Sequence, residues 1–111
     1  MEELTLVSPD DARRLVGEGA TLLDVRGDEE WRAGRAPGAL HVALADLPDE
    51  LQRLNREELV VCVCRSGARS RRAALFLTEC GFRAANLEGG MLAWVETGGD
   101  LVADGVDPRV A

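Results

Sequence analysis

Runs of apolar residues mark three predicted strands along the chain. The strongest is "LVVCV" at 59–63, which is apolar at every position, as in a strand of a parallel sheet that helices cover on both faces. "ATLLDVR" at 20–26 is an apolar run that ends in polar residues, and "RAANLEGG" at 83–90 predicts a weak strand and a turn. The pattern therefore indicates a buried sheet.

The segments around these runs have the pattern of helices. The clearest helix start is Ser8, a good capping residue, which is followed by Pro9 at the first helical position and by two acids. We expect this helix to run to about residue 17 or 19. Further helical segments are predicted at 28–34, 47–55, 68–80 and 90–98, with a loop at 35–40 that Pro37 and Gly38 impose.

Two of these helical segments show a clear apolar face. The segment 47–55 repeats leucine at three- and four-residue spacing, and the segment 68–80 gathers Ala73, Phe76, Leu77 and Cys80 on one side. Strands that alternate with helices imply an α/β fold with right-handed crossovers. Because no repeat or linker divides the 111 residues, we expect a single domain of 1–111, with its core at about 5–103 and a tail of uncertain structure at 104–111.

Composition excludes several classes of protein. Three cysteines, an odd number, argue against a disulfide scaffold, and their spacing with the single histidine, His41, does not fit a zinc site, so no metal is expected. The N-terminal "MEELTLVSPD" lacks the pattern of a secretory signal, and no apolar run is long enough to cross a membrane. The sequence therefore predicts a cytoplasmic protein.

Charge is unevenly distributed. The net charge of −7 disfavours binding to nucleic acid and to anionic membranes. Residues 64–83, however, carry five arginines and one glutamate, a local charge of +4, whereas the rest of the chain has eight basic and nineteen acidic residues. This basic segment indicates either a site for a small anionic substrate or a solvated helix face without a ligand.

Cys64 lies inside this basic segment, in "CRSGARS", where the strand at 59–63 ends and the helix at 68–80 begins. In a parallel α/β sheet, ligands bind at the carboxyl ends of the strands. Gly67 allows the loop a conformation in which successive backbone N–H groups turn inward, and the helix N-terminus adds partial positive charge. A cysteine in such surroundings is expected to have a lowered pKa, and its thiolate is a nucleophile.

Three ordered blocks of sequence carry a resemblance to a known family. They are the loop "CRSGARS", the segment "LLDVRGDEEWRAGRAPGAL" at 22–40 and the segment "NLEGGMLAW" at 86–94. In order and spacing, the three blocks resemble the rhodanese superfamily, and together they span most of the chain.

The resemblance implies a small α/β domain with a central parallel sheet of about five strands and helices on both faces. It also implies sulfur transfer, in which Cys64 carries a persulfide as the covalent intermediate and no separate cofactor is needed. The expected partners are a small anionic sulfur donor such as thiosulfate, and a thiol, cyanide or acceptor protein that removes the sulfur. The resemblance assigns substrate binding to the loop residues Arg65, Ser66, Gly67, Ala68 and Arg69.

Other residues of these blocks are expected to support the site. Asp24 and Arg26 end a neighbouring strand and should border the pocket, more as a structural pair than as catalysts. Arg35 stands where the family often has histidine, so whether Arg35 faces the pocket is open. Residues expected to pack in the core or at a strand end are Trp31, His41, Cys62, Cys80 and Trp94.

Two alternative functions are compatible with these residues. Rhodanese-like phosphatases use the same fold, but their loops place five residues between cysteine and arginine, whereas four separate Cys64 from Arg69. A non-enzymatic module that relays sulfur or binds a partner is the other alternative. Arsenate reduction is less supported because no second thiol is obviously exposed. The sequence leaves the donor, the acceptor and the oligomeric state open.

Overall fold

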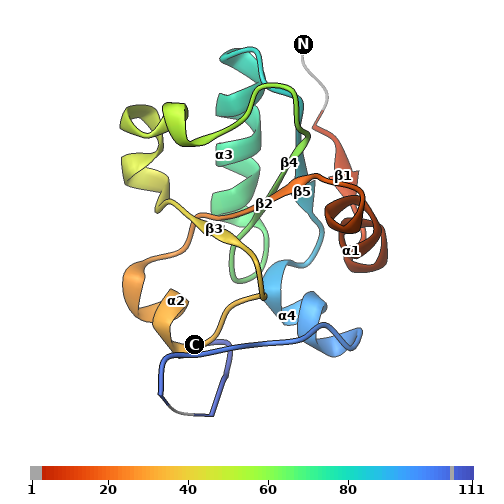
Figure 1. Cartoon of the computed structure of the whole chain (residues 1–111), viewed down its shortest axis with the longest axis vertical. Helices are drawn as coiled ribbons and strands as arrows, with labels where there is room; N and C mark the ends of the chain where they lie inside the picture. The colour runs from red at the N-terminus through yellow and green to blue at the C-terminus, as the bar shows by residue number, and fades with distance from the viewer. Residues whose placement is uncertain (1–3, 106) are drawn as a thin grey trace.

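A five-stranded parallel sheet forms the centre of the protein, with the strand order β1-β5-β4-β2-β3 (Figure 1). The structure, a computed structural model, describes residues 4–105 and 107–111. The strands are β1 (Leu6–Val7), β2 (Thr21–Asp24), β3 (Leu40–His41), β4 (Val60–Val63) and β5 (Ala84–Leu87). The parallel α/β fold expected from the sequence is thus confirmed. The two-residue edge strands β1 and β3 were not marked by the apolar pattern.

Helices follow the strands along the chain. In the part of the chain that the structure describes, the α-helices are α1 (Pro9–Gly17), α2 (Asp28–Ala33), α3 (Ala68–Glu79) and α4 (Gly90–Glu96). The start of α1 agrees with the prediction, because the Ser8 hydroxyl accepts a hydrogen bond from the Asp11 N–H at 3.1 Å. The sequence thus places this helix start correctly.

The predicted helix at 47–55 differs in the structure. It is replaced by two short 3-10 helices, η1 (Leu44–Asp49) and η2 (Leu51–Arg53). Pro48 lies within η1, where its missing N–H and its ring disfavour a regular α-helix. The leucine spacing still identifies core residues, since Leu47 is fully buried and Leu54 is 8% exposed.

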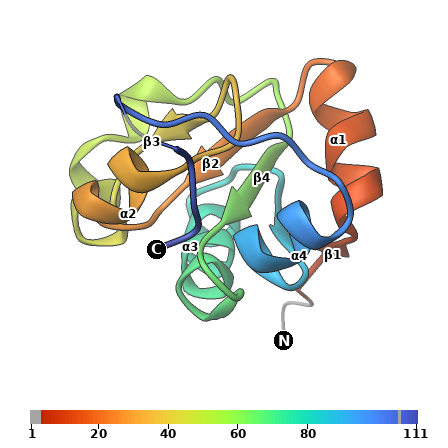
Figure 2. The same ribbon diagram turned by 90° about the horizontal axis from the view of Figure 1, so that it is seen from below.

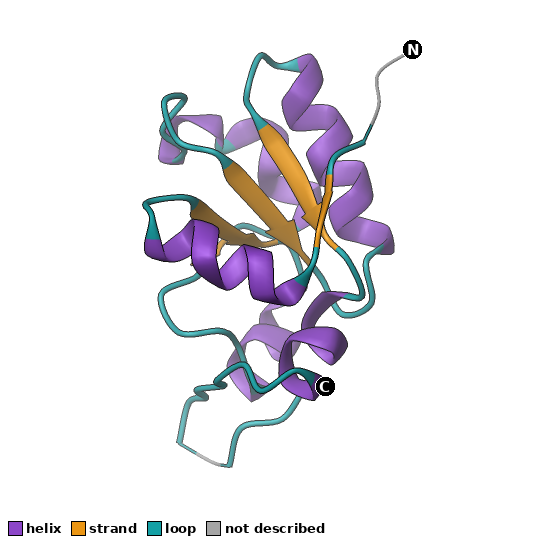
Figure 3. Ribbon diagram, turned by 90° about the vertical axis from the view of Figure 1, so that its right-hand side faces the viewer, coloured by secondary structure: helices purple, strands orange, loops and turns teal. Residues whose placement is uncertain are grey.

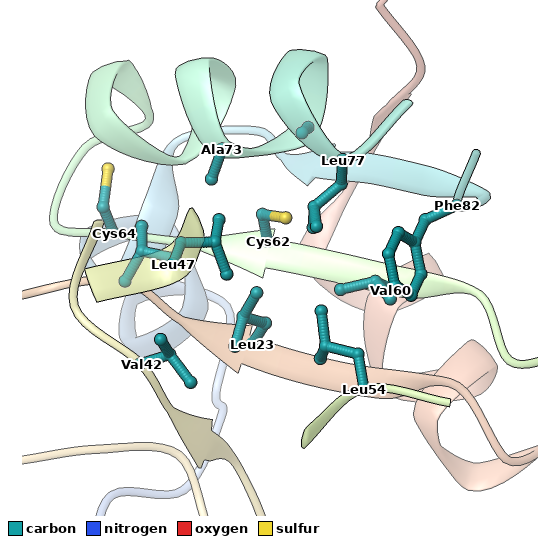
Figure 4. Close-up of a cluster of buried hydrophobic side chains, with 12 residues drawn as sticks. Leu23, Val42, Leu47, Leu54, Val60, Cys62, Cys64, Ala73, Leu77 and Phe82 are labelled. Carbon is teal, nitrogen blue, oxygen red and sulfur yellow. The ribbon is translucent and has the colours of Figure 1, made fainter. Parts of the chain in front are cut away.

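Helices cover both faces of the sheet (Figure 3). On one face, α3 and the 3-10 helices pack on the strands, in the apolar cluster drawn in Figure 4, which includes Leu23, Leu47, Val60, Cys62, Cys64, Ala73, Leu77 and Phe82. On the other face, α1 and α4 pack against residues that include Leu22, Val61, Val63 and Leu87. Both faces of β4 are therefore buried, as its uninterrupted apolar sequence predicts.

The segment after α4 crosses the molecule toward α2 (Figure 2). Val102 and Arg35 exchange two backbone hydrogen bonds, each 2.9 Å long, and the Arg109 N–H donates to the Ala33 carbonyl at 2.9 Å. Val110 packs against the apolar cluster under α1 and α4. The tail at 104–111, of uncertain structure from the sequence, is thus bound to the α2 segment in its described residues. Within the described part of the chain, no helix has the length and apolarity of a membrane span.

Candidate active site

Cys64 follows β4 directly and lies at the carboxyl end of this central strand. Three residues separate it from α3, and the last of them, Gly67, caps the helix with a φ of 119°, a conformation that favours glycine. The start of α4 fixes the same turn from the other side, because the Met91 N–H donates to the Cys64 carbonyl at 2.8 Å and the Leu92 N–H to the Arg65 carbonyl at 3.1 Å. The sequence blocks at 64–70 and 86–94, distant along the chain, thus hold the loop after β4 in place.

The Cys64 side chain is held between an apolar cluster and the polar loop. It is 1% exposed and lies at one end of the cluster under α3 (Figure 4). Its Sγ accepts a hydrogen bond from the Gly67 N–H at 3.1 Å, and the Ser70 hydroxyl lies 3.3 Å from the same atom. The sulfur is buried and yet faces donors of the loop, as a stabilised thiolate requires.

The pKa of Cys64 lies below its ordinary value. Burial alone would raise this pKa, but hydrogen bonds from the Ser70 hydroxyl and from the backbone N–H groups of Ser70, Gly67 and Ser66 outweigh it. Cys62, two residues earlier on β4, shows the opposite effect: burial, with repulsion from Cys64, raises its pKa to about 12. The pKa of the thiol in the loop is thus lowered, whereas that of the thiol within β4 is raised.

Arg69 forms an ion pair that the sequence did not predict. Its Nη1 and Nη2 donate to the two carboxylate oxygens of Glu30, on α2, at 2.7 and 2.8 Å. The hydrogen bond from Arg69 is the main cause that lowers the pKa of Glu30 to about 2, and the same contact raises the pKa of Arg69. Glu30 also accepts from the Gly27 N–H at 3.1 Å. Arg69 thus ties the helix after the loop to α2.

The remaining loop residues present different surfaces. Arg65, Ser66 and Ala68 are exposed, whereas Gly67 is half-buried. The Arg65 guanidinium reaches the end of the tail, where its Nε donates to the Ala111 carbonyl at 3.1 Å. The structure therefore gathers the five expected loop residues around Cys64, but the side chains of Arg65 and Arg69 both contact other segments.

Asp24 and Arg26 form a fully buried ion pair. Arg26 donates from Nε at 3.0 and 3.1 Å and from Nη2 at 2.8 Å to the Asp24 carboxylate, and its Nη2 also donates to the Gly34 carbonyl at 2.7 Å. Both side chains are inaccessible to solvent, so they fix the end of β2 against the Gly34 segment.

Arg35 and His41 both contact the Trp31 ring. The Arg35 guanidinium lies 4.9 Å from the Trp31 ring centre, and the His41 ring stacks on Trp31 with centres 4.6 Å apart. Arg35 also pairs with Asp104 at 2.7 Å, and His41 Nε2 lies 2.8 Å from the Arg26 carbonyl. Arg35 therefore binds the tail segment, and His41 packs at a strand end as expected.

Ser70 and Asn86 are two polar residues at the site that sequence reasoning missed. Ser70 is fully buried and Asn86 is 4% exposed. Asn86 interrupts the otherwise apolar strand β5. Because a buried amide needs hydrogen-bond partners, this interruption was the signal in the sequence that a polar contact lies here. Its partners are the Ser70 hydroxyl at 2.6 Å and the Gly67 carbonyl at 3.1 Å. In the described residues, no three His, Cys, Asp or Glu side chains gather as they would around a metal ion.

Comparisons with known proteins agree with this geometry. Residues 8–97, which include all three sequence blocks, match the family model described as "Rhodanese-like domain". The chain is 44% identical over 73 residues to "Putative sulfurtransferase YtwF" of Bacillus subtilis, covering 66% of this chain and 71% of that protein. It is 37% identical over 87 residues to a protein of Allochromatium vinosum named "Sulfurtransferase", covering 78% of this chain and 81% of that one. The crystal structure of a rhodanese-related protein from Thermoplasma volcanium has a TM-score of 0.84 at 26% identity, covering 90% of this chain and 99% of that one.

Proposed function

Because the chain belongs to the rhodanese-like domain family and two of its relatives are named sulfurtransferases, we propose that it transfers sulfane sulfur through a persulfide on Cys64. The observation that carries this proposal is the pair of donors at the sulfur: the Gly67 N–H at 3.1 Å and the Ser70 hydroxyl at 3.3 Å from Sγ. Both favour the thiolate, which is the nucleophilic form of cysteine.

In the first step, the Cys64 thiolate attacks the outer sulfur of thiosulfate. A new bond forms between Sγ and this sulfur, the sulfur–sulfur bond of thiosulfate breaks, and its electron pair leaves with sulfite. The product is a Cys64 persulfide whose negative charge lies on the terminal sulfur. Atoms, electrons and charge balance between the two reactants, so the step consumes no additional proton or oxidant.

The loop supports this step by its backbone and by its charge. Its N–H groups lie at the N-terminus of α3, where the helix dipole also favours an anion. The exposed Arg65 adds positive charge next to Cys64 in the chain, and Arg69, held by Glu30, keeps the start of α3 in place. These features suit a small sulfur oxyanion.

In the second step, a nucleophilic acceptor attacks the terminal sulfur. The bond from Sγ to that sulfur breaks, and its electron pair returns to Sγ as the thiolate. Cyanide would leave as thiocyanate and a thiolate as a new persulfide. The same donors that favour the first thiolate stabilise this leaving group, so the transfer should follow ping-pong kinetics.

The geometry around Arg69 disfavours the phosphatase alternative. Four residues separate Cys64 from Arg69, and both Nη groups of Arg69 already donate to Glu30. A phosphatase needs this fork to bind two phosphate oxygens. We therefore expect no hydrolysis of p-nitrophenyl phosphate, and phosphatase activity that Cys64→Ser abolishes would contradict the assignment.

Mass spectrometry after exposure to thiosulfate tests the proposal. The Cys64 peptide should gain the mass of one sulfur atom, which cyanide then removes as thiocyanate. Cys62→Ser is the matched control, since it removes a buried thiol two residues from Cys64 and should leave the gain intact. If the wild-type Cys64 peptide gains no sulfur, the protein is a binding module rather than a sulfurtransferase. Sulfur uptake without thiocyanate release to cyanide would instead favour relay to a dedicated protein.

A further inference from the structure

A buried chain of hydrogen bonds links the Cys64 sulfur to the strand β5. Ser70 lies in the first turn of α3, with its hydroxyl 3.3 Å from Cys64 Sγ and 2.6 Å from Asn86 Oδ1. Ser70 is fully buried and Asn86 is 4% exposed, so water does not compete freely for these groups. Inside a protein, such contacts are stronger than in solvent.

The orientation of the Asn86 amide follows from its second partner. Nδ2 donates to the Gly67 carbonyl at 3.1 Å, because a carbonyl can only accept. The Asn86 oxygen therefore faces Ser70, where it can accept a hydrogen bond from the hydroxyl. Asn86 thus binds both the loop residue Gly67 and the helix residue Ser70.

The Ser70 hydroxyl has a single hydrogen and three acceptors that compete for it: Asn86 Oδ1, Cys64 Sγ and the Gly67 carbonyl at 3.3 Å. Asn86 Oδ1 is the nearest acceptor at 2.6 Å, and Cys64 Sγ at 3.3 Å is favoured only when it carries a negative charge. A neutral divalent sulfur is a weak acceptor. Rotation about the Cβ–Oγ bond is enough to redirect the hydrogen from one acceptor to another.

We propose that Ser70 and Asn86 form a donor switch, in which the Ser70 hydroxyl binds the Cys64 thiolate and turns to Asn86 when the persulfide forms. The proposal rests on the proposed function for the persulfide state only. When an acceptor removes the terminal sulfur, the electron pair returns to Sγ and the hydroxyl turns back to it. Asn86 is a positioning residue. It accepts the hydrogen bond of the buried Ser70 hydroxyl in the persulfide state, in which Cys64 Sγ carries no negative charge.

The switch makes different predictions for the two half-reactions. Ser70→Ala removes a donor that acts on the thiolate and not on the persulfide. It should therefore slow the discharge of the preloaded persulfide to cyanide by about tenfold, since the leaving thiolate is less stabilised. The thiolate is also more basic in the variant, so loading at a pH above its pKa should not slow. Ser70→Thr, which keeps the hydroxyl, should restore discharge.

Asn86 is tested through the thiol alone, without any sulfur transfer. The pH dependence of Cys64 alkylation by iodoacetamide gives its pKa in the persulfide-free protein. Ser70→Ala should raise this pKa by about one unit or more. Asn86→Leu keeps the number of non-hydrogen side-chain atoms and removes the nearest competing acceptor, leaving the Gly67 carbonyl at 3.3 Å. This variant should lower the pKa of Cys64, but only while Ser70 is present. The ionisable neighbours of Cys64, Cys62 on β4 and Arg69 on α3 with its partner Glu30 on α2, are unchanged in every variant.

The double variant Ser70→Ala/Asn86→Leu decides the assignment. Equal pKa values in this protein and in Ser70→Ala support the switch, because Asn86 then acts only through the hydroxyl. The switch is overturned if Asn86→Leu shifts the pKa of Cys64 equally in the wild-type and Ser70→Ala backgrounds, or raises it in the wild-type background. Asn86 would then act by holding the loop backbone. If Asn86→Leu does not fold, the Ser70 variants still test the switch. Ser70→Ala would overturn it by slowing persulfide loading and persulfide discharge to the same extent. A failure of sulfur uptake contradicts the proposed function. The alkylation experiment would still test whether Ser70 and Asn86 control the pKa of Cys64 through their hydrogen bonds.

Discussion

Glu30 and Arg69 join two helices through paired hydrogen bonds of 2.7 and 2.8 Å, although they lie 39 positions apart in the sequence. The pair connects α2 to the helix that begins at the Cys64 loop. The planar fork of arginine suits this bidentate contact, which fixes orientation as well as distance. Arg69 is therefore a positioning residue for the loop, and its fork is not available to a substrate oxyanion.

Loss of the Glu30 charge should lower stability in a pH-dependent way. The contact with Arg69 lowers the pKa of Glu30 to about 2, so its contribution is present above the unfolded-state value and is lost as the pH falls toward 2. Because both side chains are partly exposed, we expect Glu30→Gln to lower the free energy of unfolding by only about 1 kcal/mol at pH 7. Urea unfolding at several pH values measures this difference, which should vanish near pH 2.

Glu29→Gln is the matched control for this experiment. Glu29 neighbours Glu30 on α2, is exposed, and undergoes the same change of charge. An equal effect of both substitutions would show that net charge, rather than the Arg69 contact, is responsible.

Cys64 should be alkylated much faster than Cys62 in the folded protein. The hydrogen bonds of the loop lower the pKa of Cys64, whereas burial raises that of Cys62 to about 12. At pH 7 we expect a ratio of rates of at least about tenfold, and Cys62 should react only after unfolding. Peptide mapping after a short treatment with iodoacetamide measures both sites. Comparable labelling of the two cysteines in the native state would mean that the loop does not activate Cys64.

The position of Cys64 could be predicted because local signals mark it. The apolar run of β4 ends one residue before it, and Gly67 precedes the helical pattern of α3. The two edge strands of the sheet escaped prediction, since two residues are too few to show a period. These edge strands form because β5 and β2 offer backbone hydrogen-bonding groups to β1 and β3.

The polar partners of the site could not be predicted because they come from distant segments. Ser70 and Asn86 lie 16 residues apart, and an isolated serine or asparagine does not reveal which backbone or side chain it will meet. The pairing of Arg69 is of the same kind. From the sequence, Arg69 was assigned to substrate binding through the family resemblance, and only the fold shows that α2 brings an acid to it.

The Asp24–Arg26 pair should contribute to stability rather than to chemistry. Both side chains are fully buried, and the Arg26 guanidinium donates three of its hydrogen bonds to Asp24. Asp24→Asn leaves a buried guanidinium without its counter-charge, so we expect unfolding to become easier by about 3 kcal/mol. The double variant Asp24→Leu/Arg26→Met should lose less, because it removes both charges. Denaturant unfolding tests this order, and the folded fraction of Asp24→Asn should still take up sulfur on Cys64.

Gly34 should be required for the tail to lie against α2. A Cβ at this position would collide with the backbone of Arg109, whose N–H donates to the Ala33 carbonyl at 2.9 Å. Gly34→Ala is therefore expected to displace the tail and to lower stability by about 1–3 kcal/mol, as overpacking does. Gly17→Ala at the end of α1 is the control, since its Cβ would meet nothing within 4 Å.

Hydrogen exchange shows whether the loss in Gly34→Ala is local to the tail. The amides of Val102 and Arg109, which donate to Arg35 and Ala33, should exchange faster in this variant, while those of β4 should remain protected. The displaced tail also withdraws the Ala111 carbonyl from Arg65, so that the Arg65 guanidinium loses this hydrogen bond. We then expect KM for thiosulfate to fall at low salt, because a free cation near Cys64 attracts the donor anion. A protected tail in Gly34→Ala, or unchanged KM once exchange shows the tail displaced, would mean that the tail does not restrain Arg65.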